Sequence, residues 1–138
     1  MDRRAFIAAT LAAAALPLPG QAGEAVRYVP GVVPAKLAEG KTLLLGFHEV
    51  WCTTCDRQKR VIGSLRSSDP VYNRVLTFIN IDYGRHRQGE LVQNLRIPRR
   101  STLVALHGDQ EVGRLIAATG TRHIQDLMDK AVAAAQSA

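Results

Sequence analysis

The sequence is poor in cysteine and has no internal repeats. Its 138 residues include two cysteines, with no second CxxC motif and no zinc-finger spacing of histidines, which argues against a zinc site. No low-complexity linker divides the chain, so we expect one domain with one core. The formal net charge is +6, yet the chain lacks a DNA-binding motif and a basic patch interleaved with aromatic residues. We therefore expect a basic surface that favours acidic partners, not a nucleic-acid interface.

The two cysteines lie three residues apart, between an apolar run and a helix-like stretch. Residues 42–48 predict a strand buried on both faces, and residues 56–66 predict a helix. Cys52 would then stand at the helix N-terminus, where free N–H groups and the helix dipole stabilise a thiolate. The thiolate is the species that attacks in disulfide exchange. Cys55 follows at i+3 on the same helical face, so we predict that Cys52 attacks and Cys55 resolves.

Two other uses of this cysteine pair stay open. The pair could form a structural disulfide, although so small a ring constrains the unfolded chain only weakly. Alternatively, His48, Cys52 and Cys55 offer soft ligands that could hold Cu(I). A copper-binding metallochaperone is therefore the competing class of function.

Residues 43–55, which end in Trp51-Cys52-Thr53-Thr54-Cys55, resemble the active-site segment of the thioredoxin superfamily. The chain most resembles the exported bacterial thioredoxin-like proteins, over about residues 41–133. The resemblance implies an α/β thioredoxin fold, with a central mixed β-sheet flanked by helices. It also implies a thiol:disulfide oxidoreductase that uses the Cys52–Cys55 disulfide as its redox centre and needs no further cofactor and no metal.

The predicted order of elements agrees with that family. Apolar alternation, turn residues and helical periodicity give the boundaries. We expect an extended arm at 26–34, strands at 42–48, 76–82, 101–107 and 111–117, and helices at 35–39, 52–65, 71–75, 88–96 and 121–135. Thr121 is the expected N-cap of the last helix.

The sequence departs from the family at the place of its cis-proline. Alignment on Thr102-Leu103 puts Ser101 there. A cis bond between Arg100 and Ser101 would cost about 3–4 kcal/mol, so we expect a trans bond or a strained bond that its surroundings hold. In the family, the backbone beside this proline pairs with the incoming peptide. We therefore predict that Arg100, Ser101 and Thr102 bind substrate, together with Trp51 as an apolar docking face.

A second departure concerns proton transfer. Many thioredoxins carry a buried aspartate on the strand before the motif, and Gly46 stands at that position here. His48 and Glu49 are then the nearest candidates for proton transfer. An imidazole titrates near neutral pH, whereas a carboxylate near Cys52 would raise the thiol pKa.

Residues 1–22 are predicted to be a signal peptide that is cleaved near 22–25. Arg3 and Arg4 precede an alanine-rich apolar stretch and then small residues, which is the pattern of an export signal. The arginine pair resembles a twin-arginine signal, with general secretion as the alternative. Residues 26–138 then form the thioredoxin-like domain, located in the bacterial periplasm, where disulfides persist.

The resemblance further implies a task. We expect reduction of exported proteins, in cytochrome c maturation or sulfur metabolism, with electrons from a membrane donor because the periplasm lacks a reducing pool. A periplasmic disulfide oxidant is the alternative. The expected partners are protein thiols and disulfides, and we expect a monomer with no stable membrane insertion after the signal is removed.

Overall fold

The computed structural model describes residues 25–137, so the predicted signal peptide lies outside the described residues. These residues form a single mixed sheet in the order β1-β3-β2-β4-β5. The strands are β1 Val26–Arg27, β2 Thr42–His48, β3 Leu76–Asp82, β4 Thr102–His107 and β5 Gln110–Ile116. The helices are α1 Val32–Ala38, α2 Thr53–Ser68, α3 Pro70–Val75, α4 Tyr83–His86, α5 Glu90–Leu95 and α6 Thr121–Gln136.

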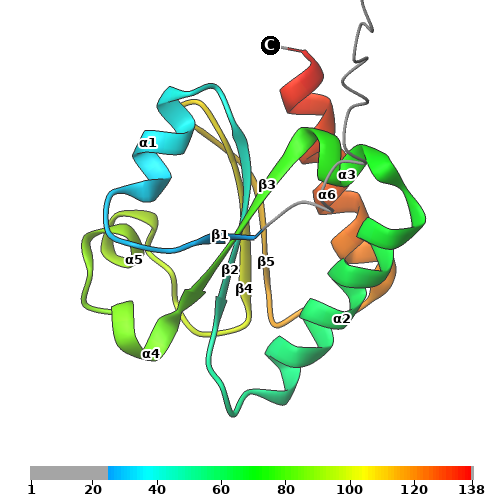
Figure 1. Cartoon of the computed structure of the whole chain (residues 1–138). Helices are drawn as coiled ribbons and strands as arrows, with labels where there is room; N and C mark the ends of the chain where they lie inside the picture. The colour runs from blue at the N-terminus through cyan, green and yellow to red at the C-terminus, as the bar shows by residue number, and fades with distance from the viewer. Residues whose placement is uncertain (1–24, 138) are drawn as a thin grey trace, which may run out of the picture.

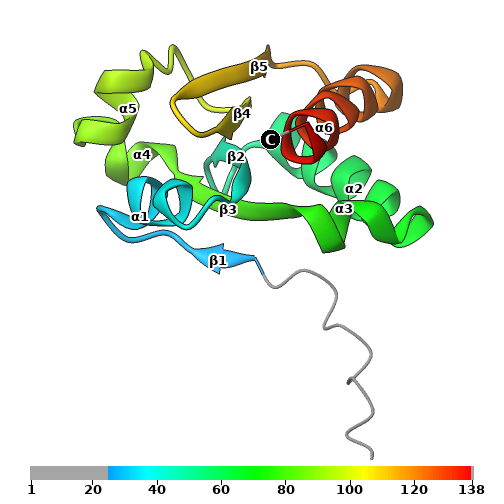
Figure 2. The same cartoon turned by 90° about the horizontal axis from the view of Figure 1, so that it is seen from above.

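Helices cover both faces of the sheet. One face packs against α1, α4 and α5, and the other packs against α2, α3 and α6, as Figures 1 and 2 show. The central strand β2 pairs in parallel with β3 and antiparallel with β4. The predicted mixed sheet flanked by helices is therefore confirmed.

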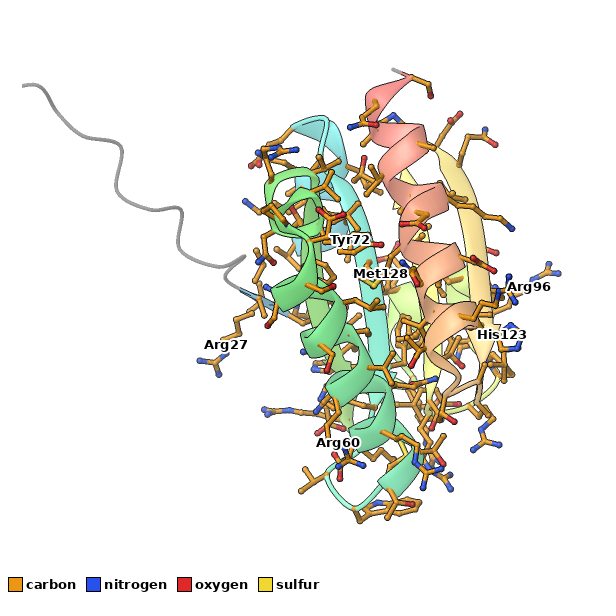
Figure 3. All side chains as sticks on the ribbon, turned by 90° about the vertical axis from the view of Figure 1, so that its right-hand side faces the viewer. Arg27, Arg60, Tyr72, Arg96, His123 and Met128 are labelled. Carbon is orange, nitrogen blue, oxygen red and sulfur yellow. A yellow bond between two sulfur atoms is a disulfide. The ribbon has the colours of Figure 1, made fainter. Side chains whose placement is uncertain are left out.

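Side chains of β2 alternate between two cores, as the pleat of a strand requires. Leu44 packs with α2, α3 and α6, whereas Leu43, Leu45 and Phe47 pack on the side of α1 and α5. Burial on both faces explains the unbroken apolar run of this strand. On the outside of the molecule, Arg27, Arg60, Arg96 and His123 are exposed, while Tyr72 and Met128 are buried (Figure 3).

Several boundaries differ from the prediction. Helix α1 starts at Val32, not at residue 35, because a proline in the first helical turn needs no N–H partner. The unpredicted helix α4 begins where the Asp82 carboxylate accepts the N–H of Arg85 at 3.0 Å. Gly120 precedes α6 as its N-cap without a side-chain bond, so the prediction of Thr121 as the cap is wrong.

Among residues 25–137, no helix has both the length and the apolar character that a bilayer crossing requires. The sheet instead presents the end of β2 and the start of α2 at one edge of the domain, at the bottom of Figure 1. Both cysteines lie at this edge.

Candidate active site

The disulfide between Cys52 and Cys55 sits at the N-terminus of α2. Cys52 is the N-cap residue with extended backbone angles, and its sulfur accepts the Cys55 N–H at 3.1 Å. The Cys52 N–H in turn donates to the Glu49 carbonyl at 3.2 Å, which closes the turn between β2 and α2. A thiolate at Cys52 would thus meet a donated hydrogen bond and the positive end of the helix dipole.

Apolar side chains stand exposed beside this buried disulfide. Cys52 and Cys55 are 3% and 1% exposed, whereas Val50 and Trp51 are 90% and 66% exposed. The Arg100 guanidinium lies 4.2 Å from the centre of the Trp51 ring, which is a cation–π geometry. The Arg100 Nε atom is buried and has no hydrogen-bond partner within the described residues.

Ser101 lies against both sulfur atoms. Its hydroxyl oxygen is 3.1 Å from Cys52 Sγ and 3.2 Å from Cys55 Sγ. No peptide bond among the described residues is cis, so the Arg100–Ser101 bond is trans, and Ser101 has a φ of 62°. A serine in this left-handed region is strained by roughly 1–2 kcal/mol, so the predicted trans bond comes with strain at the residue itself.

Gln58 is a site residue that the sequence interpretation missed. It lies one helical turn after Cys55, is 3% exposed, and donates from Nε2 to the carbonyls of Ser101 and Ala118, both at 2.9 Å. The spacing of i+3 from Cys55 places Gln58 on the buried face of the helix, and this spacing could have predicted its burial. The amide ties α2 to the loop before β4 and to the segment after β5.

Comparison with known proteins reveals the fold. No protein-family model and no curated protein sequence matches this chain. Among solved structures, Trxlp from Edwardsiella tarda matches with a TM-score of 0.65 and 25% identity, over 74% of this chain and 95% of that one. Thioredoxin from Trypanosoma brucei brucei gives 0.64 and 18%, over 83% and 96% of the two chains. Thioredoxin from Schistosoma mansoni gives 0.63 and 16%, over 80% and 98%. The chain has a thioredoxin fold.

The thioredoxin-like site carries a CxxC disulfide. Two electrons and two protons open such a disulfide to two thiols, and their removal closes it again. This is the chemistry of a thiol:disulfide oxidoreductase. The predicted fold and the CxxC disulfide with its adjacent Trp51 are therefore confirmed, and Ser101 stands near the cysteines as predicted.

Burial changes what Ser101 and Thr102 can do in this thioredoxin fold. Both are 0% exposed. The Ser101 N–H donates to the Phe47 carbonyl at 2.7 Å, and the Ser101 carbonyl accepts the Ala117 N–H at 2.9 Å. The Thr102 hydroxyl donates to the Arg99 carbonyl at 2.7 Å. The Ser101 main chain and the Thr102 hydroxyl are thus already hydrogen-bonded, so neither offers a free group for pairing with a peptide backbone. Trp51 lies exposed beside the disulfide, and the substrate contact predicted for it and for Arg100, Ser101 and Thr102 stays a prediction.

The predicted proton-transfer residues point elsewhere. His48 Nδ1 lies 3.4 Å from the Gly46 carbonyl, and burial, followed by the charge of Lys59, lowers the pKa of its ring. The Glu49 carboxylate packs against Gly84. A Cβ atom added to this glycine would lie only 2.5 Å from the Glu49 Oε1 atom. In the described part of the chain, no hydrogen bond links either side chain to a sulfur, so the geometry gives these two roles no support.

A small cavity marks the place of the missing aspartate. It measures about 160 Å³ and is lined by Gly46, Lys59, Asn80 and Leu103, among others. Residues 25–137 contain no group of three or more His, Cys, Asp or Glu side chains that could hold a metal ion. His48, Cys52 and Cys55 are thus not brought together as a copper site.

Proposed function

We propose that this chain exchanges dithiol for disulfide with protein partners in the periplasm. The observation that carries the proposal is the Cys52 sulfur, which caps α2 and accepts the Cys55 N–H. In the reduced protein these groups favour the thiolate, so Cys52 attacks a partner disulfide and forms a mixed disulfide. Cys55, one helical turn along, then displaces the partner.

The docking face in this proposal consists of Val50, Trp51 and Arg100. Exposed aromatic and aliphatic side chains beside a reactive group suit contact with another protein. The guanidinium stacked on Trp51 adds positive charge at the same place. We therefore infer that the partner presents an apolar segment with an acidic residue close to its cysteine.

The direction of electron flow has two candidates. The resemblance to exported thioredoxin-like proteins supports a reductant that acts in cytochrome c maturation or sulfur metabolism and draws electrons from a membrane donor. The two donors at the Cys52 sulfur, Cys55 N–H and the Ser101 hydroxyl, favour an oxidant instead. They stabilise the thiolate, and stabilising the reduced form makes a disulfide more oxidising.

Trapping tests the exchange mechanism. Cys55→Ser should hold a partner protein as a covalent adduct at Cys52, which a reducing agent releases. Cys52→Ser is the matched control, because it leaves one buried thiol and should trap nothing. Equal adducts from both variants, or none from either, would contradict the assigned roles.

Export is tested separately. In a bacterial host, the mature protein should appear in the periplasmic fraction with a new N-terminus near residues 22–25. Replacing Arg3 and Arg4 by lysine distinguishes the routes, since a twin-arginine signal requires the arginines and a general-secretion signal needs only positive charge. An uncleaved protein in the cytoplasm would contradict the proposed location.

A further inference from the structure

The Ser101 hydroxyl has few possible hydrogen-bond acceptors. The residue is fully buried, and the oxygen lies within hydrogen-bond distance of both sulfurs. Sulfur atoms in a disulfide carry no hydrogen, so the hydroxyl must be the donor in the oxidised protein. On reduction, the same oxygen can donate to one sulfur and accept from the other.

The surrounding backbone fixes this oxygen in place. Three hydrogen bonds hold the Ser101 main chain, from its N–H to the Phe47 carbonyl and to its carbonyl from Ala117 N–H and Gln58 Nε2. They come from β2, from the segment after β5 and from α2, and they hold the residue at its strained φ of 62°. Strain kept at a reactive site by its surroundings is a feature of preorganised groups.

Cys55 needs help to lose its proton. Its side chain is 1% exposed, so a base dissolved in water has little access to it. Gly46 offers no carboxylate, and His48 and Glu49 contact other groups. The hydroxyl of Ser101, 3.2 Å away, is the side-chain group within the described residues that can take a hydrogen bond from this thiol.

We propose that Ser101 is a catalytic residue that relays a proton between the two cysteines and the partner. This proposal rests on the exchange function proposed above. In the reduced protein, the hydroxyl donates to the Cys52 thiolate and accepts from the Cys55 thiol. In the mixed disulfide, the Cys55 proton passes to the Ser101 oxygen while the Ser101 proton passes to the departing partner sulfur. The Cys52–Cys55 bond forms as the bond between Cys52 and the partner breaks, so the partner leaves as a thiol and Ser101 is regenerated.

Two substitutions separate the hydroxyl from the backbone strain. Ser101→Ala removes the hydroxyl and keeps a side chain at positive φ, whereas Ser101→Gly removes the hydroxyl and relieves the strain. The free energies of unfolding of the two variants should therefore differ. Their Cys52 pH profiles and resolution rates should change by the same amount, because both lack the hydroxyl. Thermal unfolding of both variants shows that each is folded and measures the difference.

The readouts are the pH profile of Cys52 and the rate of resolution. In the reduced variants, alkylation of Cys52 by iodoacetamide should show a thiol pKa raised by about one unit, since a donated hydrogen bond to the thiolate is lost. With oxidised glutathione as the probe, release of the second glutathione should slow by about 10- to 100-fold at neutral pH. The deficit should shrink at high pH, where Cys55 ionises unaided.

The outcomes discriminate between the claims. If the wild-type protein forms no glutathione adduct at Cys52, the exchange function itself fails. If the wild-type protein resolves its adduct and both variants match its rate and pH profile, the relay is wrong and the exchange function stands. A defect in Ser101→Ala that is absent in Ser101→Gly would also overturn the relay, because backbone strain would then be its cause.

Discussion

At the scale of single residues, Arg100 adds a positive charge to the docking face. Its guanidinium stacks on Trp51, and its buried Nε atom lacks a hydrogen-bond partner within the described residues. The positive charge of the guanidinium beside Trp51 would attract an incoming carboxylate. Arg99 is the neighbouring arginine, but it is exposed and bonds the Arg100 carbonyl.

We predict that Arg100→Gln weakens exchange with acidic partners. For a disulfide peptide with glutamate beside its cysteine, kcat/KM should fall about 3- to 10-fold at low salt, and the loss should shrink at high salt as the charges are screened. A peptide with lysine at that position should lose little, and Arg99→Gln should change either rate less. Equal losses for both peptides would contradict charge recognition.

Gln58 has a structural role that the neighbouring sequence does not reveal. Its amide donates to two carbonyls that belong to segments 43 and 60 residues further along the chain. Without the amide, the Ser101 carbonyl keeps the Ala117 N–H, but the Ala118 carbonyl loses this donor, and leaving a buried carbonyl unpaired costs about 1–3 kcal/mol. We predict that Gln58→Leu destabilises the oxidised protein by this amount in urea unfolding.

Gln93→Leu is the matched control for that measurement. Its amide donates to a single carbonyl, that of Arg87, in an exposed setting, so its loss should cost less than about 0.5 kcal/mol. If both glutamine variants unfold at the same urea concentration, the assigned role of Gln58 in bracing the site is wrong.

The cysteine chemistry was predictable at this scale, but its surroundings were not. Cys52 and Cys55 lie three residues apart in sequence, at the junction of a strand and a helix, which local patterns indicate. The contacts of Ser101 with the sulfurs span 49 and 46 residues. Alignment placed Ser101 near the pair, but no local pattern tells whether a serine there faces the substrate or the disulfide.

At the scale of elements, the Tyr72 side chain links α3 to α6. The Tyr72 hydroxyl donates to Asp129, and the Tyr72 side chain is buried. Burial first, and then the hydrogen bond and charge of Asp129, raise the pKa of Tyr72 to about 12. Helix α3 also packs against the apolar core that includes Leu127 and Met128 of α6, so the hydrogen bond adds to this packing.

We predict that Tyr72→Phe destabilises the protein by about 1.5–3 kcal/mol at neutral pH, the usual effect of losing a hydrogen bond to a charged group. Because the folded pKa is raised above that of the unfolded chain, this stabilisation is present below pH 10 and is lost as pH rises towards 12. Urea unfolding should therefore show the two proteins converging over that range. A constant difference would contradict the assignment.

The accuracy of the predicted element boundaries depended on how strong the local sequence pattern was. Strands β2 and β3 match the predicted ranges because long apolar or alternating runs end at clear breaks. The start of α1 and the whole of α4 were missed because both helices are short. Their limits depend on a tolerated proline and on the Asp82 cap, which hydrophobic periodicity does not report.

At the scale of the whole molecule, the thioredoxin fold brings together three separate parts of the chain at one edge of the sheet. The end of β2, the start of α2 and the loop before β4 meet at the disulfide, and the segment after β5 bonds Ser101 and Gln58 beside it. The fold class followed from the order of elements. The direction of electron flow depends on the relative stabilities of the oxidised and reduced forms, which no sequence pattern states.

The most direct test of the account is the redox equilibrium of the Cys52–Cys55 pair in glutathione buffers. Trp51 is the only tryptophan of the sequence and adjoins the disulfide, so its fluorescence can follow the reaction. We predict one reversible two-electron transition. Its reduction potential should be about −270 mV if the protein is a reductant, or about −120 mV if it is an oxidant. A pair that reaches no reversible equilibrium with glutathione would contradict the central claim that this protein exchanges disulfides.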